Sequence, residues 1–157
     1  MSLKKKQNQY FLKMIKDIII TPLKILKDER GQVMHMLRCD HKVFNSFGEI
    51  YFSTIKKDKI KAWHLHLKST LNYACVKGKA KLVLFDNRDK SETKGNFQEI
   101  IISPEKYFLV TIPPGIWNGF KGIDQNETII ANCLNFPHDE NEMVRKDPND
   151  KYFNYNW

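Results

Sequence analysis

Two histidines separated by a single residue are the part of this sequence best suited to chemistry. They are His64 and His66, with Leu65 between them. Alternate side chains of a β-strand point to the same face, so both imidazoles project into whatever cavity such a strand lines. Paired imidazoles inside a barrel serve either as metal ligands or as acid/base groups. Further residues are needed to decide between these two kinds of site.

The segment most relevant to that choice is a predicted strand end that runs into a Pro-Pro-Gly turn at 113–115. The next polar side chain is Asn118, where small β-barrels of the cupin type usually carry another histidine. Behind the histidine pair, the window for a glutamate ligand holds Ser69, Thr70 and Leu71. A metal centre with an open position needs three or four nitrogen or oxygen ligands. Two imidazoles and a neutral amide meet this need poorly, so we expect an acid/base site and no bound metal.

The elements that must position these side chains begin after a short N-terminal segment. Apolar residues at helical spacing predict a helical extension over 1–17. From there on, short apolar runs alternate with turns, which is typical of a sandwich or barrel rather than of βαβ units. We predict an all-β, cupin-like jelly-roll barrel as one domain over 18–157. The expected strands are 18–20, 23–26, 33–38, 49–55, 62–67, 72–76, 80–85, 99–102, 108–112 and 128–134.

Composition narrows the class of protein. The chain has 157 residues, enough for one domain with its own core, and no apolar run long enough to predict a membrane-spanning helix. Cys39, Cys75 and Cys133 are odd in number and far apart, which predicts buried, reduced thiols in a cytoplasmic protein. The net charge is +8, with lysines concentrated between 56 and 81. That concentration favours either an anionic ligand such as a nucleotide diphosphate or a solubilising surface, and no nucleic-acid motif accompanies it.

A series of landmarks follows in order along the chain. They are Asp28-Glu29-Arg30-Gly31, Glu49-x-Tyr51-x-Ser53, Lys61-Ala62-Trp63-His64, Asp86-x-Arg88 with Ser91, Thr93 and Gly95, Ile112-Pro113-x-Gly115 with Gly119-Phe120, and Lys146-Asp147-Pro148. In order and spacing they resemble the dTDP-4-dehydrorhamnose 3,5-epimerase family of metal-independent jelly-roll cupins. The resemblance implies a cofactor-free homodimer that acts on a nucleotide-diphosphate sugar in surface polysaccharide synthesis.

The resemblance also assigns roles to single residues. By position, His64 is the base that removes a proton from a sugar carbon beside a C4 ketone, and Asp147 is the carboxylate that holds and polarises it. Lys61 stands where the family has an arginine and would neutralise the developing enolate or a phosphate. A proton next to a carbonyl is acidic only if the enolate is stabilised, so a near-neutral base with a cation beside it suits the step.

Substrate-binding roles fall on a wider set. Arg30 matches a position that contacts the nucleotide phosphates, commonly from the neighbouring subunit. Arg88 has a structural alternative, in which it pairs with a carboxylate under the barrel, and His66 has one as a hydrogen-bonded wall residue. The expected substrate-binding residues are Arg30, Tyr51, Ser53, His66, Asn72 and Asn118.

Three positions depart from the family. The active-site lysine falls near Leu71 or Asn72, the turn histidine is Asn118, and the tyrosine acid falls near Ala131. Inverting a stereocentre requires a proton donor on the face opposite the base, and an alanine cannot be one. The candidates to replace it are Tyr152, Tyr155 and His138.

These departures leave several outcomes open. The prediction is an epimerase or ketoisomerase of a nucleotide-linked 4-keto-deoxysugar, acting at one carbon or moving protons on one face. The first alternative is a non-catalytic cupin that binds a sugar or nucleotide, and the second is a metal-dependent cupin such as a dioxygenase.

Overall fold

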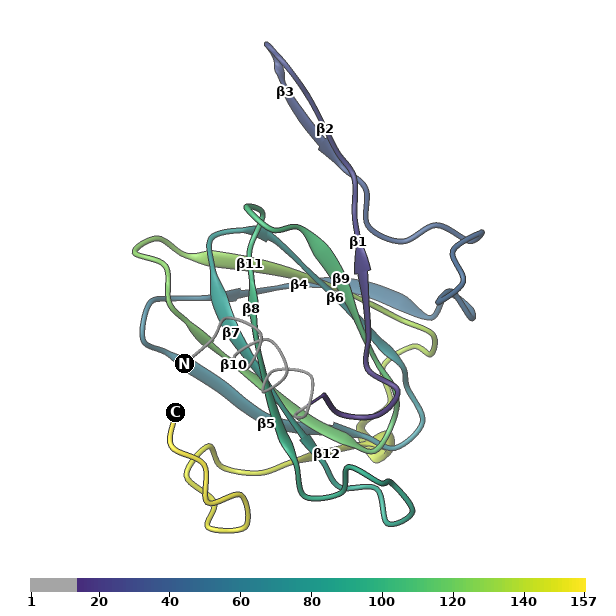
Figure 1. Cartoon of the computed structure of the whole chain (residues 1–157), viewed down its shortest axis with the longest axis vertical. Helices are drawn as coiled ribbons and strands as arrows, with labels where there is room; N and C mark the ends of the chain where they lie inside the picture. The colour runs from purple at the N-terminus through teal and green to yellow at the C-terminus, as the bar shows by residue number, and fades with distance from the viewer. Residues whose placement is uncertain (1–13) are drawn as a thin grey trace, which may run out of the picture.

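Two five-stranded antiparallel sheets face each other in the computed structural model, which describes residues 14–157 (Figure 1). The first sheet contains, in spatial order, β1 (Ile19–Pro22), β9 (Phe108–Ile112), β6 (Leu71–Lys77), β11 (Thr128–Leu134) and β4 (Glu49–Ile55). The second contains β12 (Met143–Arg145), β5 (Ile60–His66), β10 (Ile116–Gly122), β7 (Ala80–Asp86) and β8 (Phe97–Ile102). The predicted all-β jelly roll is confirmed.

A two-stranded hairpin projects away from the two sheets. It consists of β2 (Ile25–Asp28) and β3 (Gly31–Met34), and Figure 1 shows it as an arm that extends beyond the barrel. The chain returns from this arm to β4 through an irregular segment. Near the other end of the chain, the 3-10 turn η1 (Glu140–Glu142) leads directly into β12.

The main core lies between the two sheets, where alternate residues of facing strands meet. Leu71 and Tyr73 of β6 and Ile130 of β11 are buried there against Leu84 and Ile116 of the second sheet. Because side chains alternate along a strand, this inward set also fixes which residues face outward.

The outer face of the second sheet is covered by the C-terminal tail. Trp63 of β5 is fully buried on that side, with its ring 4.4 Å from Phe153 and 4.8 Å from Trp157. Leu65 belongs to the same cluster. Since Trp63 and Leu65 point outward, His64 and His66 of the same strand point into the barrel.

The start of the described chain differs from the prediction. Most of the expected N-terminal helix, residues 1–13, lies outside the described residues. Residues 14–17 form an irregular stretch and a turn instead of a helix. Ile15 is buried in the main core, and the Asp17 carboxylate accepts a hydrogen bond from Arg88 at 2.7 Å. The division of the chain into 1–17 and 18–157 stays a prediction.

Strand β10 was not predicted, and its presence changes the position of Asn118. The Pro-Pro-Gly turn ends at Gly115, and Asn118 is the third residue of a central strand rather than the end of a turn. The strand was missed because Gly119 and Gly122 weaken the residue pattern that predicts a strand. At Gly119 a Cβ would lie 2.4 Å from the Cβ of Ala62, so the close approach of β10 to β5 requires the missing side chain.

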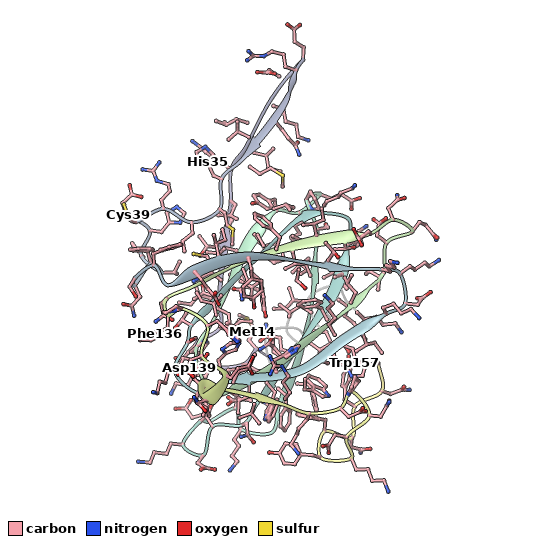
Figure 2. The ribbon with its side chains drawn as sticks, turned by 180° about the vertical axis from the view of Figure 1, so that it is seen from behind. Met14, His35, Cys39, Phe136, Asp139 and Trp157 are labelled. Atoms are coloured by element: carbon pink, nitrogen blue, oxygen red, sulfur yellow. The ribbon has the colours of Figure 1, made fainter. Side chains whose placement is uncertain are left out.

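The prediction of buried, reduced cysteines holds for two of the three residues. Cys75 and Cys133 are buried and free, as predicted. Cys39 is exposed, because it lies on the segment outside the barrel, where Figure 2 labels it together with His35. Within residues 14–157, no helix has the length and apolar character needed to cross a membrane.

Candidate active site

A cavity of about 460 Å³ opens into the barrel beside β5. It is lined by residues of both sheets and of the segment that leads into β12. These are Glu49, Tyr51, Ser53, Lys61, Ala62, His64, His66, Tyr73, Phe120, Leu134, His138, Glu142, Met143 and Arg145. A larger and shallower hollow, along β8, contains no histidine. The histidine cavity is therefore the candidate site.

His64 stands in this cavity with cations around it. Directly opposite it on β12 is Arg145, and opposite residues of antiparallel strands point to the same face. Burial is the main cause that lowers the pKa of His64 to about 4, and the positive charges of Arg145, His66 and Lys61 add to it. No residue in the described part of the chain forms a hydrogen bond with the ring. Near neutral pH, His64 is thus an uncharged imidazole with a lone pair that can accept a proton.

The carboxylate expected beside His64 is not there. Asp147 is exposed, and its side chain accepts a hydrogen bond from the backbone N–H of Asn149 at 2.8 Å. No hydrogen bond or ion pair joins it to His64 among residues 14–157. The reason is the register: β12 ends with Arg145 opposite His64, and Asp147 follows two residues later in a turn that faces solvent.

A different carboxylate is paired with the second histidine. The Nδ1 atom of His66 lies 2.5 Å from Oε1 of Glu142, and both side chains are buried. The hydroxyl of Ser69 donates to the same oxygen at 2.9 Å, while the backbone N–H groups of Lys68 and Ser69 donate to Oε2 at 3.2 and 3.3 Å. Burial raises the pKa of Glu142, but the bonds from His66, Lys68 and Ser69 outweigh it, and the pKa is lowered. Glu142 is therefore an ionised carboxylate.

Sequence reasoning missed Glu142 because it lies in an acidic stretch that is typical of a solvated surface. The only local signal is the pair of apolar residues Met143 and Val144, which is too short to recognise as the strand β12 that it belongs to. That strand brings η1 against the end of β5, opposite His66.

Lys61, Ser53 and Tyr51 all line the cavity. The Lys61 ammonium donates to the Ser53 hydroxyl at 3.1 Å, which links β5 to β4. The Tyr51 hydroxyl accepts a hydrogen bond from the side-chain amide of Asn132 at 2.9 Å. Burial raises the pKa of Tyr51, so the phenol keeps its proton near neutral pH. Tyr51 belongs to the sheet that faces the two histidines.

Asn118 supports the site from within the wall rather than lining it. It is fully buried, its side-chain amide donates to the carbonyl of His64 at 3.1 Å, and its carbonyl oxygen accepts from the Tyr73 hydroxyl at 3.0 Å. Asn118 therefore has a structural role in the cavity wall, and its expected contact with substrate stays a prediction. It fixes the backbone of His64 and the orientation of Tyr73.

Two other expected binding residues lie away from the cavity. Asn72 is on the opposite face of β6 and is hydrogen-bonded to the Cys133 carbonyl at 3.1 Å and to the Thr111 hydroxyl at 2.7 Å. Its alternation with Tyr73 explains the difference. Arg30 lies in the turn between β2 and β3, where it pairs with Asp28 at 2.7 Å.

Arg88 follows its structural alternative. Its guanidinium donates two hydrogen bonds to the buried carboxylate of Asp86, each at 3.0 Å, and a third to Asp17. Ser91 and Thr93 donate to the same Asp86 oxygen at 2.6 and 2.7 Å. Burial raises the pKa of Asp86, but these bonds outweigh it and hold the pKa well below its usual range.

The residues suggested as replacement acids separate by location. Tyr152 and Tyr155 pack in the aromatic cluster outside the second sheet, away from the histidines. His138 lines the cavity and is bonded to the exposed Glu140 at 2.8 Å. In the stretch from residue 14 to residue 157, no three side chains of His, Cys, Asp or Glu are grouped so that they could hold a metal ion.

Comparison with known proteins agrees with the fold. Residues 13–157 match the family model of dTDP-4-dehydrorhamnose 3,5-epimerase. The crystal structure of a dTDP sugar isomerase from Desulfovibrio desulfuricans is 34% identical, has a TM-score of 0.89, and the alignment covers 91% of this chain and 92% of that one.

Two curated relatives are more distant in sequence. A "probable low-salt glycan biosynthesis epimerase", Agl13 of Haloferax volcanii, is 28% identical over 75% of this chain and 77% of the relative. The spore coat polysaccharide biosynthesis protein SpsL of Bacillus subtilis is 26% identical over 92% of this chain and 97% of the relative.

Proposed function

Because this chain belongs to the dTDP-4-dehydrorhamnose 3,5-epimerase family, we propose that it moves a proton at a carbon beside the ketone of a nucleotide-linked 4-keto-deoxysugar, with His64 as the base. The observation that carries the proposal is the state of His64: an uncharged ring, open to a cavity, with two cations beside it. Such a ring can take a proton from carbon, and the cations favour the negative charge that the step leaves on the substrate.

The step is balanced without a cofactor. His64 takes the proton from C3 or C5, and the electron pair of the broken C–H bond forms a C=C bond to C4. The carbonyl electrons move to O4, which becomes an enolate oxygen. Return of a proton to the same carbon from the other face gives the epimer. After removal from C3, transfer of the O3 hydroxyl proton to O4 and return of a proton to C4 give the isomeric 3-ketone.

Tyr51 is our candidate for the acid on the opposite face. It projects from β4 of the facing sheet, lines the cavity, and keeps its proton near neutral pH. Asn132 fixes the position of its hydroxyl. The other cavity tyrosine, Tyr73, is almost completely buried and already donates its proton to Asn118, so it is less available.

The nucleotide diphosphate would be bound by the positive side of the cavity and by a second copy of the chain. Lys61 and Arg145 supply positive charge in one protomer. The hairpin β2–β3 exposes Leu26, Val33 and Arg30 beyond the barrel, a composition suited to reaching a neighbouring protomer. We therefore propose a homodimer, to be tested by size-exclusion chromatography with light scattering. The free cysteines agree with a reducing, cytoplasmic location.

One observation favours the alternative of a non-catalytic sugar-binding cupin: Asp147 does not orient His64. Hydrogen exchange with solvent separates the two functions. The protein is incubated in deuterated water with dTDP-linked and GDP-linked 4-keto-6-deoxysugars, and the C3 and C5 signals are followed by proton NMR. We expect deuterium to enter at one or both carbons with the wild-type chain and not with His64→Ala. Binding without any exchange would establish the alternative instead.

A further inference from the structure

We propose that His66, held by Glu142, is the electrophilic acid of the cavity: its Nε2–H donates to the ketone oxygen while His64 removes the proton from carbon. The inference rests on the proposed function, because it needs a carbonyl substrate in this cavity. It gives the two imidazoles of one strand different tasks.

The orientation of the His66 ring is the first support. Its Nδ1 atom is occupied by Glu142, which leaves Nε2 as the nitrogen that can meet a ligand. His66 lines the cavity on the same face of β5 as His64. Two residues along a strand correspond to about 7 Å, so both rings can reach one sugar at neighbouring atoms.

The environment of Glu142 is the second support. Its two oxygens accept four hydrogen bonds, from His66, from the Ser69 hydroxyl and from two backbone N–H groups. A carboxylate satisfied in this way keeps its negative charge even though it is buried. It stabilises the positive charge that a protonated His66 ring carries, and it fixes which nitrogen faces the cavity.

The charges around the two rings differ in sign. His64 has Arg145 opposite it on β12 and Lys61 on its own strand, and no carboxylate partner in the described structure. His66 has Glu142 from η1, and the residue opposite it on β12 is the uncharged Met143. Two imidazoles whose surroundings carry opposite charge are suited to act as base and acid of one reaction.

The other cations of the cavity already have partners. Arg145 donates to Glu140 at 3.0 Å, and Lys61 donates to Ser53 at 3.1 Å. Each can attract an anion, but Arg145 is held by an exposed carboxylate and Lys61 by an uncharged hydroxyl. His66 is held by a buried carboxylate, which is the arrangement that transition-state stabilisation requires.

In the resulting step His64 takes the proton from carbon, and the C–H electron pair becomes the C=C bond. The carbonyl electrons move to O4, which takes the proton from Nε2 of His66. The products are an enol, a protonated His64 and a neutral His66 that remains bonded to Glu142. The reverse transfers restore both rings, and no oxidant or reductant is needed.

The test uses the exchange assay on the full chain with four variants: His66→Asn, Glu142→Gln, Glu142→Asp and the control Glu105→Gln. Glu105 is an exposed carboxylate that pairs with Lys79 outside the cavity. We expect His66→Asn to lower kcat by about 100-fold or more, with KM changed by less than about threefold. dTDP serves as the binding probe, and its affinity should stay close to that of the wild type in every variant.

The two substitutions of Glu142 distinguish charge from shape. Glutamine keeps the size and loses the charge, whereas aspartate keeps the charge and is shorter. If Glu142 acts by its charge on His66, Glu142→Asp retains a higher kcat than Glu142→Gln; if it only fills space, the order is reversed. The Glu105→Gln control should leave kcat unchanged.

Several results of this assay would overturn the role proposed for His66. A wild-type kcat in His66→Asn, or a loss of kcat that follows a loss of dTDP affinity, overturns this inference and leaves the proposed function intact. A higher kcat in Glu142→Gln than in Glu142→Asp also overturns it. If the wild-type chain exchanges no deuterium with any nucleotide-linked 4-keto-sugar, both the inference and the proposed function fail.

Discussion

The two faces of β5 divide stability and chemistry between neighbouring residues. On the outer face Trp63 and Leu65 are packed under the aromatic tail, with rings of Phe153 and Trp157 in contact. On the inner face His64 and His66 border a cavity, and His64 has no hydrogen-bond partner for its ring among residues 14–157. A closely packed outer face thus allows polar groups on the inner face to stay incompletely satisfied.

The largest expected effect is on the outer face. Trp63→Ala should lower the free energy of unfolding by about 3–5 kcal/mol, because it removes a fully buried ring and leaves a cavity. Denaturant unfolding measures the change. Leu67→Ala, one residue after β5 at an exposed position, is the matched control and should change stability by no more than about 0.5 kcal/mol. An equal loss in both variants would show that the outer cluster does not anchor the strand.

On the facing sheet, Tyr51→Phe should separate proton removal from inversion. Without the phenol proton, exchange at carbon continues, while formation of the inverted product falls by about 100-fold. NMR of the products in deuterated water reports both quantities in one experiment. Tyr152→Phe removes a hydroxyl from the outer tail and should alter neither. A parallel loss of exchange and inversion in Tyr51→Phe would contradict the role given to Tyr51.

The cations beside His64 on the inner face should affect the pH dependence of kcat/KM. Because His64 works as a base only when neutral, kcat/KM should fall as the pH drops through the His64 pKa of about 4. Arg145→Gln removes a cation that lowers this pKa, so the fall should begin at a higher pH. Lys94→Gln removes a distant surface charge that pairs with Asp89 and should leave the profile in place. An unshifted profile in Arg145→Gln would contradict the effect of the opposite strand.

The smallest expected effect is at Asp147. Since its carboxylate faces solvent and bonds to the backbone of Asn149, Asp147→Asn should change kcat by less than about threefold. Steady-state kinetics measure this directly. A loss as large as that of His66→Asn would mean that Asp147 turns inward when substrate binds.

The sequence was sufficient where period-two alternation decides the answer. It predicted that His64 and His66 share a face, and most strands of the jelly roll followed from apolar runs between turns. The order of the landmarks also selected Tyr51, Ser53 and Lys61 as candidates, and all three line the cavity.

The sequence was insufficient where pairing between distant strands decides the answer. The two glycines of β10 weaken its strand pattern, so this central strand was not predicted and Asn118 was assigned to a turn. The acidic run around Glu142 resembles a solvated surface until β12 is placed opposite β5. Register is a property of tertiary packing, so neither Glu142 nor the outward turn of Asp147 could be derived from local pattern.

The central claim is that His64 exchanges a proton with the carbon beside a ketone. The most direct test is the rate of deuterium incorporation into a nucleotide-linked 4-keto-6-deoxysugar by the wild-type chain and by His64→Gln, with dTDP affinity measured for both. The account predicts that His64→Gln binds dTDP like the wild type and exchanges about 1000-fold more slowly. Equal exchange rates in the two proteins would contradict it.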